Sequence, residues 1–293
     1  RLSSTGLLCA PIDTKKYYEL FHDPLLRPAH VSFNTEAIDE ISRLSNVFTA
    51  EELAHLDHLD ATFQKNKSAY TPKMLQREHQ RVTLDYIWKS ANLEGNTYSI
   101  LDTDLLLSQG LPNAGKHISD ATMILDHKEA MNFISTPESA RALARPLTFE
   151  FVSCVHNKLT HNLPIQQGVR DVPVGISFNR YQPPPYKDTI MAALHPVLRA
   201  INNQKDPYSE ALVATVLLSY LQAFEDGNKR TARMVGNAML LQAGKFPLTY
   251  RMVDTLTYIR ALSLFYERNN LSAFKDVFIN QAEFATQHYY QKF

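Results

Sequence analysis

The stretch that decides the fold runs from Leu221 to Arg233 and reads LQAFEDGNKRTAR. An apolar run over residues 211–220 leads into it with helical spacing, and residues 233–243 are again helix-like until Gly244. The pattern therefore predicts a helix, a short polar loop and a second helix. A loop that opens a helix leaves several backbone N–H groups unpaired beside the positive end of the helix dipole, which favours an anion such as phosphate.

The charged side chains of this stretch point to the same chemistry. Asp226 offers a hard carboxylate oxygen for Mg²⁺. Arg230 and Arg233 are three residues apart, so they project from one face of the first helical turn. The helix dipole disfavours cations at that end, and two arginines there predict a bound polyanion. The alternative is a solvated turn with incidental charges.

The stretch resembles the signature of the Fic (filamentation induced by cyclic AMP) family, H-x-F-x-[DE]-G-N-[GK]-R-x-x-R. The positions that match in register are Phe224, Asp226, Gly227, Asn228, Lys229, Arg230 and Arg233. One position departs, because the family begins its signature with a histidine that acts as general base, and this chain has Gln222 there. Gln222 is either a natural degeneration or a deliberate substitution that traps a complex.

Fic proteins most often transfer AMP from ATP to a Ser, Thr or Tyr hydroxyl of a target protein. The resemblance implies that Asp226 holds Mg²⁺ and that the backbone amides of Gly227, Asn228 and Lys229 cradle the α-phosphate. It also implies that Arg230 and Arg233 bind the β- and γ-phosphates. The neutral amide of Gln222 cannot accept a proton near neutral pH. Since general-base assistance is worth about 10²–10⁴-fold, nucleotide binding is expected to survive while turnover falls.

A long helix is predicted upstream, with Thr71 as N-cap, Pro72 at the first position and a stop at Gly95. Near its end, Ser90 and Glu94 are four residues apart and share a face. This ending resembles the Fic inhibitory motif [ST]-x-x-x-E-[GN]. The resemblance implies that Glu94 pairs with Arg233 and obstructs the productive position of the γ-phosphate.

Residues 168–190 change the pattern, because β-branched alternation is followed by the helix-breaking run Pro183 to Pro185. A short β-hairpin is predicted. In Fic proteins such a hairpin is the flap, and it would pair with the target's backbone through Val174, Gly175 and Ile176. The triple proline is alternatively a polyproline II docking site for another protein. Farther on, Tyr258 stands where some family members have an adenine-side tyrosine.

The composition sets further bounds. The chain has 293 residues, 44% of them apolar, with 30 basic and 30 acidic side chains, so we expect no nucleic-acid or anionic-membrane partner. We find no bilayer-spanning run and no signal-peptide pattern, which favours a soluble, cytoplasmic protein. Cys9 and Cys154 suggest neither a disulfide framework nor a zinc site. A lone histidine on the helix predicted for residues 148–159, His156, is interpreted as a hydrogen-bonded core residue.

The resulting prediction is an all-α Fic fold with a small β-hairpin flap. Its parts are an N-terminal helical region (1–70), an inhibitory helix (71–96) and a Fic domain (97–293). The predicted activity is protein adenylyl transfer with ATP and Mg²⁺ to a target protein, or to itself, held off by Glu94 and weakened or lost through Gln222. The alternative is a catalytically inactive nucleotide-binding interaction protein. CDP-choline or UTP as donor and a homodimer are left open.

Overall fold

A computed structural model of the chain describes residues 8–20, 22–27, 32–143, 146–177 and 179–291. Within these ranges the fold is all-α and contains no strand, as predicted for the class. The N-terminal helices are α2 (Thr14–Leu20), α3 (Thr35–Arg43), α4 (Ala50–Ser68), α5 (Pro72–Asn92), α6 (Ile100–Gln109), α7 (Ile118–Ile134) and α8 (Pro137–Ala142). The others are α9 (Phe149–Thr160), α10 (Lys187–Asn202), α11 (Pro207–Leu221), α12 (Asn228–Gln242), α13 (Thr255–Arg268) and α14 (Ser272–His288).

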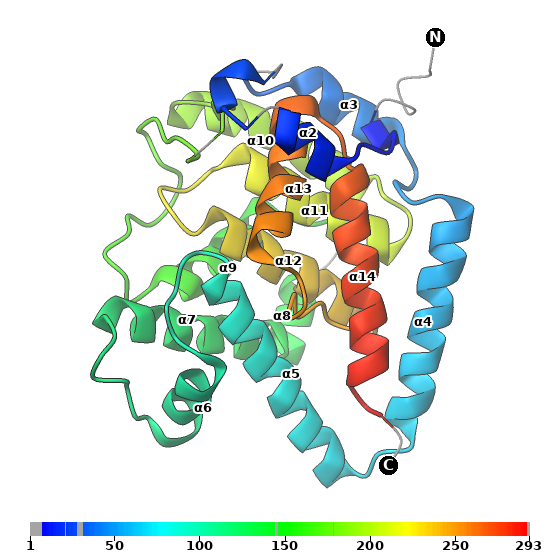
Figure 1. Ribbon diagram of the computed structural model, residues 1–293, viewed down its shortest axis with the longest axis vertical. Coiled ribbons are helices and arrows are strands. Elements are labelled where there is room, and N and C mark those ends of the chain that lie inside the picture. Colours follow the sequence, from blue (N-terminus) through cyan, green and yellow to red (C-terminus); the bar gives the residue numbers. More distant parts are fainter. Residues whose placement is uncertain (1–7, 21, 28–31, 144–145, 178, 292–293) are drawn as a thin grey trace.

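The helices α11 and α12 pack against each other at the centre of the molecule, with other helices around them (Figure 1). Every α11 side chain from Tyr208 to Leu221 is buried, as expected of a helix that is apolar on all sides. The two helices approach closely at Gly236, where an added Cβ would lie 2.4 Å from Thr215 Oγ1 and 3.1 Å from the carbonyl oxygen of Ala211. This contact requires a glycine.

The N-terminal helices cover the outside of this bundle. Helix α3 packs on α10, and α4 lies alongside α14 at one edge of the molecule (Figure 1). A buried lysine, Lys275 of α14, pairs with Glu52 of α4 at 2.6 Å. The backbone N–H of Leu271 donates to the carbonyl of Leu8 at 2.7 Å, so residues at the two ends of the chain are joined.

Helix α5 begins where the sequence predicts. The Thr71 hydroxyl accepts a hydrogen bond from the N–H of Met74, and Pro72 occupies the first helical position. The helix ends at Asn92, three residues before the predicted stop at Gly95, whose φ of 91° suits a residue without a side chain. Because α5 packs against α7 and α12, Ser90 near its end and Glu94 just beyond it both lie against α12.

The predicted β-hairpin is wrong as a ladder of paired strands. Residues 168–177 and 179–186 form neither helix nor paired strand, and the N–H of Asn179 donates to the carbonyl of Ile176. The isolated bridge in the described chain joins Ser32 to Gln182. Proline has no N–H to donate, so Pro173 and the run from Pro183 to Pro185 cannot complete a ladder. We call residues 172–177 the flap.

None of the described helices combines the length and the apolar content that crossing a lipid bilayer requires.

Candidate active site

A cavity of about 380 Å³ lies where the α11–α12 loop, the flap, α13 and the end of α5 meet. Most of the predicted site residues line it, although they come from four separate parts of the chain. The predicted residues on its wall are Glu94, Val174, Gly175, Ile176, Gln222, Asp226, Asn228, Lys229 and Tyr258. The other four predicted residues do not line the cavity, namely Ser90, Gly227, Arg230 and Arg233. Arg230 and Arg233 are hydrogen-bonded to the lining residues Asp226 and Glu94.

The loop between α11 and α12 is held by its own residues. The side chain of Asn228 accepts from the N–H of Phe224 at 2.9 Å and donates to its carbonyl at 2.8 Å. At Gly227 the φ is 80°, and an added Cβ would lie 3.1 Å from Thr160 Cγ2. Both the backbone conformation and the lack of room therefore require glycine at this position.

The start of α12 presents free backbone donors to the cavity. No side chain caps the helix at Gly227. The N–H groups of Asn228 and Lys229, two residues that line the cavity, find no acceptor among the described residues. Unpaired N–H groups and the positive end of the helix dipole together attract an anion. These N–H groups are the donors that the predicted anion site would use, and the binding of a phosphate there stays a prediction.

The ion pair predicted between Glu94 and Arg233 is formed, and its inhibitory role stays a prediction. Arg233 Nη1 donates to Glu94 Oε1 at 2.8 Å, and Lys229 Nζ lies 2.8 Å from Glu94 Oε2. The remaining donors of Arg233 bind Ser90, with Nε at 3.1 Å from its hydroxyl and Nη2 at 2.8 Å from its carbonyl. The guanidinium is fully buried, whereas the Glu94 side chain is 14% exposed.

The electrostatics of this cluster favour the charged pair. Burial alone would raise the pKa of Glu94, but the adjacent cations of Arg233 and Lys229 outweigh it, so the pKa lies below its ordinary value. Glu94 is therefore a carboxylate throughout the physiological range. Arg233 is thus already paired with a carboxylate, and any second anion at this guanidinium would have to compete with Glu94.

Tyr258 belongs to the same cluster. Its hydroxyl accepts from Arg233 Nη1 at 3.0 Å, and its ring packs edge-on against Tyr250 and Phe274. Burial raises the pKa of the Tyr258 phenol. Tyr258 also lines the cavity. Its predicted position beside an adenine ring stays a prediction.

Asp226 is 67% exposed at its side chain, and both of its oxygens already have partners. One accepts from the N–H of Gly227 at 2.6 Å and the other from Arg230 Nη2 at 3.0 Å. Arg230 is almost fully buried, and its Nη1 has no hydrogen-bond partner within the described chain. Arg230 could therefore donate to an anion in two ways. Its Nη1 is free to do so, whereas its Nη2 would first have to leave Asp226.

His156 supports the loop from outside the cavity. Its Nε2 lies 2.9 Å from the carbonyl oxygen of Asp226, and its ring stacks on Phe224 with centroids 3.7 Å apart. Burial lowers the pKa of His156, so the ring is neutral at physiological pH and donates from Nε2. The interpretation of His156 as a hydrogen-bonded core residue is confirmed.

Gln222 ends α11 in a left-handed conformation, with φ at 51°. Its side-chain Nε2 donates to the carbonyl of Ser219 at 2.6 Å, so the amide turns back onto the end of its own helix. Left-handed backbone at a residue other than glycine is uncommon and is concentrated at functional sites. The position lines the cavity but holds no group that can accept a proton.

Two residues of the site escape the sequence pattern. Arg170 is 1% exposed and donates to four backbone carbonyls, those of Val172, Pro184, Pro185 and Gln222. Glu225 lines the cavity and accepts from the N–H of Gln166 at 2.9 Å. Arg170 is a single arginine outside any periodic segment, so the sequence gives no indication of its role. Glu225 could have been predicted as a site residue because it is a carboxylate next to Asp226.

Comparisons with known proteins place this geometry in a family. The model of the Fic/DOC family matches residues 146–240. A protein adenylyltransferase Fic from Nematostella vectensis is 27% identical over 199 residues, which cover 64% of this chain and 44% of that protein. A protein of the same name from Drosophila sechellia is 24% identical over 243 residues, 79% of this chain and 47% of that protein.

The fold agrees with solved structures. The chain superposes on a Fic-1 structure from C. elegans with a TM-score of 0.69 at 20% identity, covering 82% of this chain and 72% of that one. The chain spans about half the length of the curated relatives it matches. The matched family segment contains the α11–α12 loop with its open helix start and the arginine that Glu94 holds. The chain therefore contains a Fic/DOC family domain over residues 146–240.

Proposed function

We propose that this chain is a protein adenylyltransferase that moves AMP from ATP to a Ser, Thr or Tyr hydroxyl of a target protein and releases pyrophosphate. In this proposal Glu94 holds the enzyme off, and Gln222 weakens or abolishes turnover. The observation that carries the proposal is the pairing of Glu94 with Arg233 at the edge of a cavity that opens onto the start of α12. The names of the relatives support adenylyl transfer.

The cavity offers the parts that a triphosphate needs. The uncapped start of α12 supplies free N–H groups at Asn228 and Lys229 for the α-phosphate region. Arg233 would bind the γ-phosphate in place of Glu94, and Arg230 would bind the β-phosphate through its free Nη1. Catalysis in such a site rests mostly on positioning and on neutralising charge.

Asp226 fits a Mg²⁺ ion that arrives with the nucleotide. The described residues hold no group of three or more His, Cys, Asp and Glu side chains that would make a metal site by themselves. Mg²⁺ is usually bound by one or two carboxylates together with phosphates and waters, so one exposed aspartate suffices. The ion, when bound, would neutralise phosphate charge. Asp226 would hold it, in competition with its present partner Arg230.

The flap would align the target. The backbone N–H groups of Val174, Gly175 and Ile176 find no partner among the described residues, and these residues border the cavity. A target segment could therefore pair with them as an added strand. Its hydroxyl would then face the cavity for in-line attack, although Gln222 can only orient that hydroxyl and cannot take its proton.

A second candidate function follows from Gln222 itself. Its amide is engaged with the Ser219 carbonyl and its position carries no base, while the anion site and the inhibitory pair are both intact. These features also suit a protein that binds a nucleotide and holds a partner without chemistry. The bound nucleotide would be ATP in both candidates, with CDP-choline and UTP as the alternatives to compare.

The test measures transfer of labelled AMP from ATP to the chain itself and to lysate proteins, with this sequence and with Gln222→His. Recovery in the histidine form alone would support an enzyme scaffold that Gln222 silences. Silence in both forms, with ATP binding intact by calorimetry, would favour the binding protein. Absence of ATP binding even after Glu94→Gly would contradict both candidates.

A further inference from the structure

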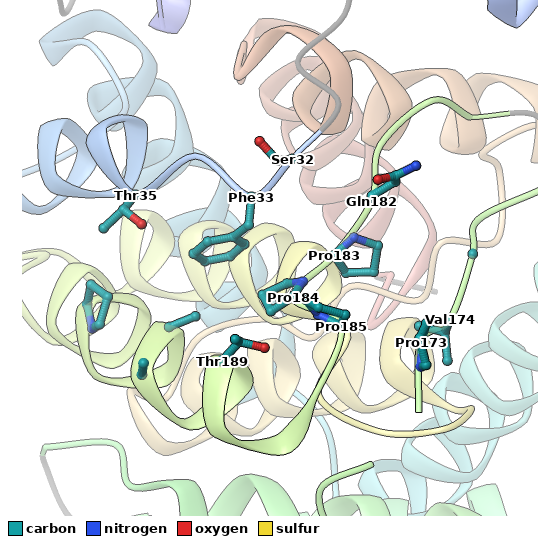
Figure 2. A pocket seen from close by; sticks show the side chains of 14 residues that line it. Ser32, Phe33, Thr35, Pro173, Val174, Gln182, Pro183, Pro184, Pro185 and Thr189 are labelled. Atoms are coloured by element: carbon teal, nitrogen blue, oxygen red, sulfur yellow. The ribbon is translucent and has the colours of Figure 1, made fainter. Parts of the chain in front are cut away.

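A second cavity, larger than the candidate active site, lies next to the flap. It measures about 830 Å³, within the range of about 300–1,000 Å³ typical of ligand sites. Figure 2 shows its walls, with Phe33 on one side, Pro183 to Pro185 beside it, and Pro173 with Val174 on the flap. We call it the proline groove. It shares Val174 and Gly175 with the candidate active site, so the flap backbone borders both cavities.

The groove is uncharged. None of its fourteen lining residues has an ionisable side chain. Burying a charged side chain of a partner here would leave that charge without a counterion, which is unfavourable. Exposed apolar side chains also stand next in sequence to the lining residues, at Val172 and Tyr186. The surface therefore suits a partner segment that is apolar and carries no charge.

The walls of the groove are held in place. Arg170 Nη2 donates to the carbonyl of Pro184 at 2.6 Å, and Nη1 donates to those of Pro185 at 2.9 Å and Val172 at 2.6 Å. Phe33 stacks on the buried ring of Tyr220, with centroids 5.0 Å apart. Since prolines and anchored rings lose little freedom when a partner binds, the groove is preorganised.

We propose that the proline groove binds an extended, apolar and uncharged segment of the target protein, close in sequence to the hydroxyl that accepts AMP. The proposal rests on the proposed function. The two cavities are continuous at the flap, so a target segment that pairs with Val174 and Gly175 would contact both of them. With its hydroxyl in the active site, such a chain lays a neighbouring stretch over the prolines. The groove thus selects the residues around the modified position.

The experiment measures binding of short fluorescent peptides to the unaltered chain by fluorescence anisotropy, so it needs no catalysis. Each peptide has a central serine, flanked by Val and Leu in one peptide, by Glu in a second and by Lys in a third. We expect the apolar peptide to bind about tenfold or more tightly than either charged one, a difference of about 1.4 kcal/mol. Equal binding of the three would overturn the proposal.

Two variants on α10 locate the site. Ala192 lines the groove and is exposed, so Ala192→Glu adds a charge there without disturbing the core. Met191 is the adjacent exposed residue and lies outside the lining, which makes Met191→Glu the matched control. We expect Ala192→Glu to weaken the apolar peptide about tenfold, equivalent to about 1.4 kcal/mol, and Met191→Glu to leave it unchanged. Equal effects of both variants would contradict a site in the groove.

Other occupants give different results. A dimer in size-exclusion chromatography that Ala192→Glu dissociates would assign the groove to a second copy of the chain and overturn the proposal. The two proposals also fail separately. If the chain prefers the apolar peptide but Gln222→His transfers no AMP, the result would contradict the proposed enzyme and support the peptide site. If Gln222→His transfers AMP equally to all three peptides, the result would support the enzyme and contradict a role for the proline groove in selecting the target.

Discussion

Arg170 Nε donates to the backbone carbonyl of Gln222 across 2.7 Å, and this bond ties the end of α11 to the prolines beside the flap. The same guanidinium binds the carbonyls of Pro184 and Pro185. It pairs with no carboxylate in the part of the chain that the structure describes. Arg170 therefore joins the prolines beside the flap to Gln222 at the end of α11 through backbone carbonyls alone.

Replacing Arg170 by methionine should loosen both ends of this connection. Buried carbonyls without a donor cost about 1–3 kcal/mol, so Arg170→Met is expected to lower the free energy of unfolding by that order. ATP affinity should change little, because the start of α12 is untouched. Chemical denaturation and calorimetry measure the two quantities. Exposed Arg141 on α8 provides the control, Arg141→Met, and equal destabilisation by both changes would argue against the role of Arg170.

Glu94→Gln should destabilise the protein without nucleotide and tighten ATP. Loss of the carboxylate leaves the buried Arg233 cation with a weaker partner, at a cost of about 1–3 kcal/mol because Glu94 is partly exposed. Thermal unfolding with and without ATP measures both effects, since a ligand that binds the folded state raises its stability. Glu283→Gln breaks the exposed pair with His55 and should have almost no effect. An unchanged ATP affinity would mean that Glu94 and ATP do not compete.

The Glu94 pair should be insensitive to mild acid. The pKa of Glu94 is lowered in the folded protein, so its stabilising contribution is present above the unfolded value of about 4.3 and is lost as pH falls through the lower folded value. The stability difference between the unaltered chain and Glu94→Gln is therefore expected to be constant from about pH 8 to 5.5. Denaturation at several pH values measures it. A difference that vanishes near pH 6 would show that another group controls the pair.

Asp226→Asn should remove the Mg²⁺ dependence of nucleotide binding. An amide oxygen is a poor substitute for a carboxylate towards this hard cation, so ATP affinity in Mg²⁺ should fall to that measured in a chelator. Titration calorimetry with and without Mg²⁺ measures the effect. Glu225→Gln changes the neighbouring carboxylate of the same cavity and should keep the dependence. If Glu225→Gln abolishes it and Asp226→Asn does not, the metal is held by Glu225.

The sequence predicts much of this site because its chemistry is local. The loop from Phe224 to Asn228 closes on itself, and α12 begins immediately after it, so spacing alone locates the anion site. The caps of α5 are equally local, with Thr71 and Pro72 at its start. The pairing of Glu94 with Arg233 is long-range, and it was predictable only because the ending of α5 resembles a known inhibitory motif.

The errors and omissions arise from long-range contacts. Alternating β-branched residues predict a hairpin, but the prolines have no N–H to donate to a partner strand. Their carbonyls instead accept hydrogen bonds from Arg170, which lies at least fourteen residues earlier. No periodicity reveals that Arg170 will be buried among carbonyls. Likewise, the proline groove joins Phe33 to residues about 150 positions later, a juxtaposition that only the packing of α3 on α10 creates.

The central claim is that Glu94 and the γ-phosphate compete for Arg233 in an adenylyltransferase whose missing base is at Gln222. Its most direct test compares AMP transfer by Gln222→His with transfer by the double variant Glu94→Gly, Gln222→His, using mass spectrometry of the chain and of added target proteins. We predict that the double variant transfers more AMP than Gln222→His alone and that Glu94→Gly alone stays nearly inactive. Equal transfer by the double variant and by Gln222→His would contradict the claim, because Glu94 would then not be an inhibitor.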